Sequence, residues 1–187
     1  GIQLPSLDLS KNIMLTYLSC GGIQLPSLDL SKNIMLTYLV CSNNQLTSLD
    51  VSKNVALCTL YCNGNQLTSL DVSKNTALTY LCCHANPFTT AEYDAIMCSL
   101  PLVSSGTGSF RPLYNSSDTN ATKFMASNAT NAKAKNWNVQ YFSGGAAISA
   151  TTGTYECPFS GNNNRYITLN VTKDSLISIG LSADTDF

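Results

Sequence analysis

The chain has 187 residues, of which 44% are hydrophobic and only 11% charged, and its formal net charge at pH 7 is -1. That length allows one domain or two small ones, each with a buried core, and the weak charge argues against nucleic acid or an acidic membrane surface as a partner. No apolar run is long enough for a transmembrane helix, so we expect no transmembrane segment. Because the chain begins inside a repeat, we expect any targeting segment or lipid anchor to lie upstream.

A letter-for-letter duplication opens the chain. Residues 1–18 read GIQLPSLDLSKNIMLTYL, and residues 22–39 repeat them. The same 21-residue period continues through diverged sequence to residue 88, and the stretch LCTLYCNGNQL has the pattern L-x-x-L-x-C-x-x-N-x-L. This is the leucine-rich-repeat pattern with cysteine in one apolar position. The sequence therefore predicts a repeat solenoid over residues 1–88.

Each turn is predicted to contain one short strand. In TLYCN, alternation places Leu60 and Cys62 inside and Thr59, Tyr61 and Asn63 outside. One such strand cannot bury its apolar face alone, so turns stacked about 4.8 Å apart are expected to form a parallel sheet with a continuous core. The segment LTSLDVSKN is predicted to return the chain on the convex side with turn or 3₁₀ character.

Two columns of inward side chains are predicted to form structural ladders. They are the cysteines Cys20, Cys41, Cys62 and Cys83 and the asparagines Asn44, Asn65 and Asn86. Equivalent atoms on neighbouring strands are about 4.8 Å apart, farther than the roughly 3.8 Å between the Cβ atoms of a disulfide, so we expect free buried thiols. The asparagine amides are expected to bond loop backbone groups that stacking would leave unpaired.

Metal sites find little support in the sequence. The chain has no C-x-x-C pair, and although Cys82 and His84 both face outward by alternation, neighbouring turns add no second Cys or His. A column of aspartates (Asp8, Asp29, Asp50 and Asp71) supplies one carboxylate per turn. Calcium needs about six to eight oxygens, so we interpret this column as turn-forming residues and expect no metal or cofactor.

The units LTSLDVSKNVALCTLYCNGNQ and LTSLDVSKNTALTYLCCHANP resemble the 21-residue, cysteine-ladder leucine-rich repeats of bacterial cell-surface proteins. These include internalin-like proteins and secreted or lipid-anchored proteins of Bacteroides-type gut anaerobes. The resemblance covers about half of the chain. It implies a horseshoe or rod-like solenoid, an extracellular or cell-surface location with outer-membrane anchoring or secretion, and protein or glycan binding on the sheet face. It identifies no ligand.

Residues 89–143 are predicted to form a C-terminal cap with short helices and strands. TTAEYDAIMCSLP reads as a helix with Thr89 as its N-cap, and its apolar residues would cover the open end of the core. Strands are expected over residues 109–115 and 136–142, with a helix over 128–136 that Asn128 caps and Asn136 ends in a left-handed conformation.

Gly144 and Gly145 are predicted to mark a boundary, and residues 146–187 are predicted to form a small β module of about three strands. A larger sandwich cut off at Phe187 is the alternative. The predicted fold class is therefore an α/β-type repeat solenoid: a leucine-rich-repeat parallel sheet with short convex turns, an α/β cap and a terminal β module.

The sequence favours binding over catalysis. His84 is the single histidine, and no nucleophile–base pair or metal cluster is recognisable, so we expect no enzymatic activity. The candidate ligand-binding residues on the concave sheet face are Tyr17, Tyr38, Val40, Thr59, Tyr61, Asn63, Tyr80, Cys82 and His84. Tyrosine suits protein interfaces and sugar stacking, but it also has a high strand propensity. We predict a module that binds a protein or glycan; the alternative is a structural spacer that displays another domain.

Overall fold

The computed structural model describes residues 4–148, all of which lie in one compact unit. The predicted β module of residues 146–187 falls outside the described residues except for its first three positions. There, Ala147 forms an antiparallel bridge with Gln140. Within the described part, none of the helices has the length and apolar character needed to cross a membrane.

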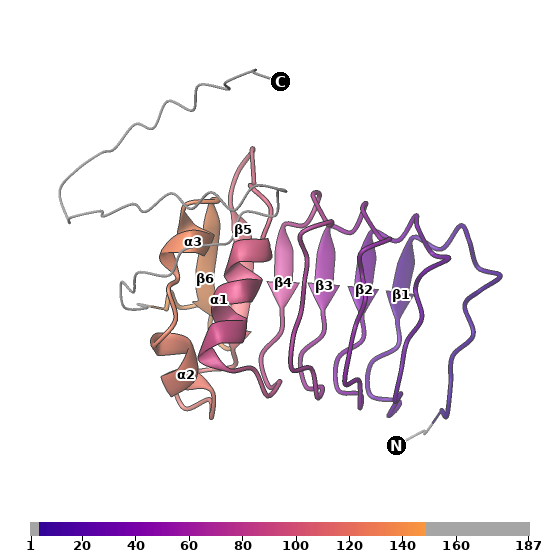
Figure 1. The fold of residues 1–187 in the computed structure, drawn as a ribbon, viewed down its shortest axis with the longest axis horizontal. Helices are drawn as coiled ribbons and strands as arrows, with labels where there is room; N and C mark the ends of the chain where they lie inside the picture. Colours follow the sequence, from indigo (N-terminus) through magenta and orange to yellow (C-terminus); the bar gives the residue numbers. More distant parts are fainter. Residues whose placement is uncertain (1–3, 149–187) are drawn as a thin grey trace, which may run out of the picture. The chain divides into compact units, whose positions relative to one another are not determined.

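Six parallel strands form one sheet in chain order (Figure 1). They are β1 (Tyr17–Ser19), β2 (Tyr38–Val40), β3 (Thr59–Tyr61), β4 (Tyr80–Cys82), β5 (Gly108–Leu113) and β6 (Trp137–Tyr141). Leu39 pairs with Leu18 on one side and Leu60 on the other, so the first strands pair at the 21-residue offset of the sequence. The parallel sheet and its repeat register are thus confirmed.

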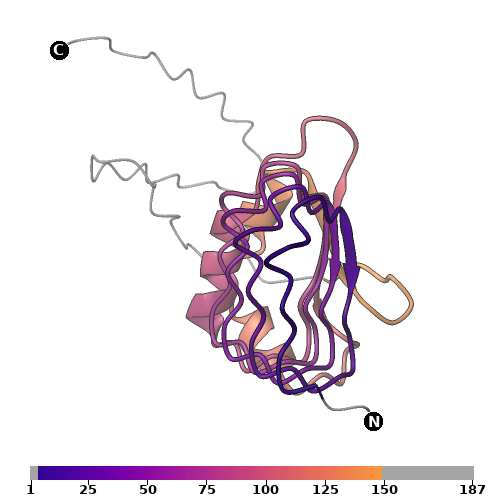
Figure 2. The same ribbon diagram turned by 90° about the vertical axis from the view of Figure 1, so that its right-hand side faces the viewer.

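The turns overlie one another when viewed along the stack, with the sheet on one side and the return segments on the other (Figure 2). Leu39, Leu60 and Leu81 are fully buried between these layers. The return segments are consecutive turns without helix: the Asn54 N–H donates to the Val51 carbonyl, and the Leu57 N–H donates to the Asn54 carbonyl, each at 3.0 Å. Turn character, rather than a 3₁₀ helix, therefore describes the convex side.

The aspartate column initiates these turns. The Ser31 and Ser52 N–H groups donate to Oδ1 of Asp29 and Asp50, at 2.9 and 2.8 Å. Hydrogen bonds from these serines hold the pKa of both carboxyl groups below its ordinary value. The Ser31 backbone contributes most at Asp29, and the Ser52 side chain contributes most at Asp50. The carboxylates thus satisfy local backbone donors, which is the role that Asp takes in Asx turns.

Two ladders of buried asparagine side chains connect successive turns. In the first, Asn65 accepts a hydrogen bond from the Leu46 N–H at 3.1 Å and donates Nδ2 to the carbonyls of Cys41 and Cys62, each at 3.0 Å. The second ladder, Asn33, Asn54 and Asn75, lies in the return segments and was not predicted. Each of its amides donates to two carbonyls of the preceding turn. The first ladder satisfies a backbone N–H that has no partner within its own turn. The second adds an inter-turn hydrogen bond to carbonyls that already accept one N–H from their own turn.

The cap begins with α1 (Thr90–Ser99), whose N-cap Thr89 accepts from the Glu92 N–H at 3.2 Å. Two short helices follow: α2 (Ala121–Met125), which was not predicted, and α3 (Thr130–Lys133), which is shorter than the expected helix. Asn128 lies just outside α3 and accepts from the Thr130 N–H, so it caps one residue earlier than a regular N-cap. Asn136 has a positive φ of 64°, as is usual after a helix end.

Aromatic rings fill the end of the core under the cap. Tyr93 of α1 contacts Phe88 and Phe124, with ring centroids 5.5 and 5.1 Å apart, and Phe124 contacts Phe110 of β5. All four side chains are fully buried. At the other end, the leucines of the first described turn are only partly covered, since a turn stacks on just one of their sides; Leu4 is 37% exposed.

Candidate functional site

Four tyrosines from successive strands form a continuous row on the concave face, called here the tyrosine row: Tyr17, Tyr38, Tyr61 and Tyr80. The ring centroids of consecutive members are 4.9, 6.1 and 4.7 Å apart. Tyr17 is exposed and the other three are half-buried. The row therefore places large, amphipathic side chains where a ligand of the concave face would touch them.

The tyrosine row does not follow one column of the repeat. Tyr38 and Tyr80 are equivalent positions, but the residue between them in this column is Thr59. Tyr61 is two residues further along β3, paired with Val40, and its ring fills the gap diagonally. Diagonal neighbours in a sheet are within reach of aromatic side chains. The alignment of the repeats identifies all four tyrosines as outward-facing, but it does not show that their rings form one continuous row.

Packing within the tyrosine row decides what it offers to a ligand. The rings of Tyr17 and Tyr38 are stacked at 16°, and those of Tyr61 and Tyr80 pack at 32°. Ring faces therefore contact neighbouring rings, while edges and hydroxyls remain available. Burial, followed by the nearby Tyr61 hydroxyl, raises the pKa of Tyr38 and Tyr80. Both hydroxyls are protonated at neutral pH, as tyrosine ordinarily is, and both interact with the Tyr61 hydroxyl.

Arg111 of β5 extends the tyrosine row beyond the repeats. Its guanidinium carbon lies 5.5 Å from the centroid of the Tyr80 ring, within the range of a cation–π interaction. Nη1 donates to the carbonyls of Tyr141 and Phe142 at 3.2 and 3.1 Å, and Nε donates to Ser109 Oγ at 3.2 Å. The guanidinium is thus held in one orientation. Arg111 was not among the predicted site residues because it lies outside the repeat; the only feature of the sequence that points to it is the strand predicted over residues 109–115.

Cys82 and His84 do not belong to an open binding face, which corrects the sequence prediction. Cys82 is 0% and His84 6% exposed. Alternation gives their direction, but the cap covers them: the His84 ring packs against Tyr114 and Phe142, with centroids 5.4 and 5.0 Å away. These two aromatic residues come from distant parts of the chain, after β5 and β6, so no repeat pattern reveals them.

His84 is buried, and neither nitrogen of its imidazole ring has a hydrogen-bonding partner among residues 4–148. Desolvation lowers its pKa, and the Asp118 carboxylate only partly opposes this effect. The imidazole is therefore neutral near pH 7. Its surroundings are aromatic rings rather than a nucleophile or metal ligands, and within residues 4–148 no three His, Cys, Asp or Glu side chains lie close enough together to hold a metal ion.

The remaining predicted face residues are half-buried: Val40, Thr59 and Asn63. Asn63 Oδ1 accepts from the Ser42 hydroxyl at 2.7 Å and from the Cys82 thiol at 3.6 Å. Its carbonyl oxygen is therefore engaged within the protein. Val40 and Thr59 flank the tyrosine row on β2 and β3, where they complete the concave surface.

The cysteine ladder lies behind this face, with Cys20, Cys41, Cys62 and Cys83 all free and buried. Desolvation raises the pKa of Cys20 to about 11 and that of Cys82 to about 12, and it raises those of Cys41, Cys62 and Cys83 as well. Thiols of this kind are unreactive hydrophobic side chains. Cys98 of α1, by contrast, is disulfide-bonded.

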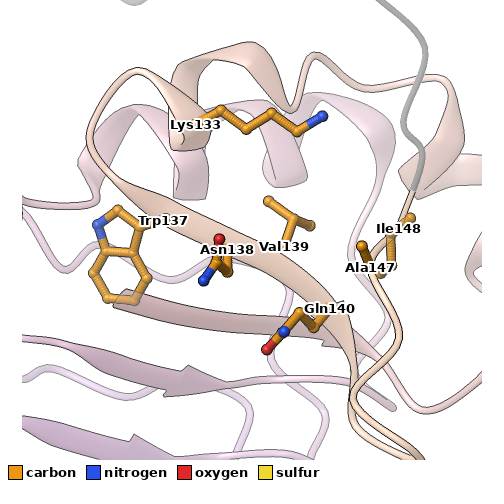
Figure 3. Close-up of a pocket in the computed structure, with 7 residues that line it drawn as sticks. All are labelled: Lys133, Trp137, Asn138, Val139, Gln140, Ala147 and Ile148. Atoms are coloured by element: carbon orange, nitrogen blue, oxygen red, sulfur yellow. The ribbon is translucent and has the colours of Figure 1, made fainter. Parts of the chain in front are cut away.

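A separate hollow of about 450 Å³ lies beside β6 (Figure 3). It is lined by Lys133, Trp137, Asn138, Val139, Gln140, Ala147 and Ile148. The Trp137 indole already donates to the Pro101 carbonyl at 2.7 Å, and Lys133 is the one ionisable lining residue. The lining residues that the structure describes therefore include no acid–base or nucleophile pair of the kind that catalysis requires.

No protein-family model matches the chain, and no curated protein matches it. Among solved structures, the chain is similar to the functional domain of InlJ from Listeria monocytogenes, which includes a cysteine ladder. The sequence identity is 46%, the match covers 49% of this chain and 21% of that chain, and the TM-score is 0.46. The description of this chain as a cysteine-ladder leucine-rich-repeat solenoid rests on its own register, ladders and parallel sheet.

Proposed function

We propose that this chain is a non-enzymatic binding module of a bacterial cell-surface or secreted protein, and that it recognises a protein ligand with its concave face. The tyrosine row is the observation that carries this proposal. Tyrosine is enriched at protein interfaces because it adds large area and a hydroxyl at a low cost in rotamer entropy. Rings already packed at centroid distances of 4.7–6.1 Å lose even less freedom on binding.

A protein ligand is favoured over a neutral glycan by the orientation of the rings. Sugar stacking needs an open aromatic face, whereas the inner rings, Tyr38 and Tyr61, have a ring of the row on either side. Only the terminal Tyr17 has a face that neither another ring of the row nor Arg111 covers. Hydroxyls and ring edges remain, and these suit the mixed polar and apolar groups of a polypeptide. Export is supported by the disulfide at Cys98, because disulfides persist in oxidising compartments outside the cytosol.

The test replaces Tyr38, Tyr61 and Tyr80 together by serine and measures binding to arrays of proteins and glycans. A matched control replaces Ile13, Ile34 and Val55 by serine; these side chains are 57, 55 and 54% exposed and lie in the return segments outside the sheet. We expect the tyrosine variant to lose the protein partners of the wild type and the control to keep them. Thermal unfolding of both variants verifies that the solenoid is intact.

A second variant with phenylalanine at the same three positions keeps the ring packing and removes the hydroxyls. A partial loss of binding is expected, because the hydroxyls supply part of the contact. Equal binding by the wild type and the serine variant would contradict the proposal. If the wild type binds no protein on the arrays, the structural spacer gains support instead.

A further inference from the structure

We propose that Arg111 forms an anion subsite at the end of the tyrosine row, and that it binds a carboxylate of an acidic protein segment lying along this row. The inference deepens the proposed function and rests on it. It adds the chemical class of the ligand, which neither the repeat pattern nor the comparisons assign.

The first support is the fixed position of the guanidinium. Three hydrogen bonds and the Tyr80 ring orient Arg111, as described above, and Nη2 has no hydrogen-bonding partner among residues 4–148. The side chain is half-buried. A preoriented guanidinium loses less rotamer entropy for each hydrogen bond that it forms with a ligand. Nη2 is therefore ready to donate to an incoming anion.

The second support is that the charge of Arg111 has no counterpart on this face. The outward-facing positions of the six strands are Tyr17, Ser19, Tyr38, Val40, Thr59, Tyr61, Tyr80, Cys82, Ser109, Arg111, Asn138 and Gln140. Arg111 is the only charged residue in this set. Within the described residues, its side-chain partners are a hydroxyl, two carbonyls and a ring, and none is a carboxylate. A ligand with negative charge would supply the missing counterpart.

Neighbouring titratable groups leave this charge uncompensated. Burial raises the pKa of the Cys82 thiol and lowers that of the His84 imidazole, so both are neutral near pH 7. Asp118 acts on His84, and its oxygens accept from the N–H groups of Tyr114 and Asn120; no salt bridge joins it to Arg111 among the described residues. The subsite therefore stays positive at neutral pH.

The two supports together favour an extended acidic peptide. The tyrosine row offers hydroxyl donors in a line, and Arg111 adds one charged donor at its end. Arginine and tyrosine are also the residues that most often dominate binding at protein interfaces. A hydrogen bond between a guanidinium and a carboxylate is roughly twice as strong as one between neutral groups. Loss of this contact is expected to weaken binding about tenfold or more.

The experiment selects a random library of displayed linear peptides on the full chain and, separately, on the Arg111→Gln variant. Peptides selected on the wild type should be enriched in Asp and Glu, should bind Arg111→Gln about tenfold more weakly, and should weaken steeply with salt. Arg111→Lys keeps the charge but loses the planar guanidinium, so it should bind with intermediate affinity. Thermal unfolding of both variants shows whether the β5–β6 contacts survive.

The opposing outcomes separate this inference from the proposed function. Peptides without acidic enrichment, or with equal affinity for wild type and Arg111→Gln, would overturn the anion subsite; if the Tyr38, Tyr61 and Tyr80 serine variant still abolishes their binding, the proposed function stands. Polygalacturonate, a carboxylated polysaccharide, serves as the second probe. Binding of polygalacturonate that depends on Arg111, without any acidic peptide, would overturn the assignment to a protein ligand.

Discussion

Ala85 holds the same left-handed backbone conformation as Gly64 one turn earlier, with φ of 54° and 66°. The column that they share begins with Gly22 and Asn43, at 72° and 56°. Glycine adopts this conformation freely and asparagine tolerates it, whereas a Cβ makes it costly. Each turn of the solenoid thus needs the same tight bend after its strand, and Ala85 is the position where the residue type fits it worst.

Replacing Ala85 by glycine is expected to raise the free energy of unfolding by about 0.5–1 kcal/mol, since relief of the backbone strain exceeds the added entropy of the unfolded chain. Ala85 is exposed, so little packing is lost. Urea unfolding measures the change. Two alanine substitutions in the same column serve as controls. Gly22→Ala introduces the backbone strain without any steric contact, because no atom lies within 4 Å of the added Cβ. Gly64→Ala adds a Cβ that also collides with Asn43 Oδ1, so it should lower the free energy of unfolding more than Gly22→Ala. If Ala85→Gly instead lowers the free energy of unfolding, the claim that the backbone of Ala85 is strained is wrong.

Asn65→Ala is expected to lower the free energy of unfolding by about 3 kcal/mol, because it strands the buried Leu46 N–H and two carbonyls. Asn75→Ala is the matched comparison in the second ladder. Asn75 donates to two carbonyls, but its Oδ1 has no partner within the described part of the chain, so its loss should cost less, about 1–2 kcal/mol. Chemical denaturation measures the free energy of unfolding of both variants. Equal losses would show that the hydrogen bond from the Leu46 N–H adds nothing to stability.

Stability should fall as the pH drops below about 6.5, the ordinary pKa of histidine. Burial lowers the pKa of His84 in the folded protein, so over the range below the unfolded pKa the unfolded chain binds more protons than the native state. Stability is therefore lost with falling pH until the folded pKa is passed. Thermal unfolding between neutral pH and pH 5 measures this, and His84→Phe should flatten the dependence in this window. If the stability of His84→Phe depends on pH as that of the wild type does, groups other than His84 cause the loss of stability at low pH.

Among the six free cysteines of the described residues, Cys58 should be the one that reacts rapidly with iodoacetamide in the native protein, because it alone is exposed. The raised pKa of the buried thiols, about 11 for Cys20 and about 12 for Cys82, removes the nucleophilic thiolate as well as access. Peptide mapping by mass spectrometry identifies the labelled positions. After unfolding without reductant, all six should react; blocked ladder cysteines would contradict the free-thiol assignment.

The repeat predicts which side chains point to the concave face, but it does not predict which of them remain exposed there. The period identified Tyr38 and Tyr61 as outward residues, and the structure shows their rings in one row. The same alternation placed Cys82 and His84 outside, but both are buried, and Tyr114 and Phe142 cover His84. A repeat pattern gives the direction of a side chain, whereas burial also depends on segments that follow no period.

The sequence by itself determined the register of the solenoid. Side chains one period apart, such as Leu39 and Leu60, must stack when each turn is too small to bury its own apolar residues. Only the tertiary structure decided where the tyrosine row ends. Arg111 reaches Tyr80 because β5 pairs with β4 across an irregular connection that includes α1, and the carbonyls of Tyr141 and Phe142 hold the guanidinium there. These contacts join residues with no fixed spacing, so they exist only once the chain has folded.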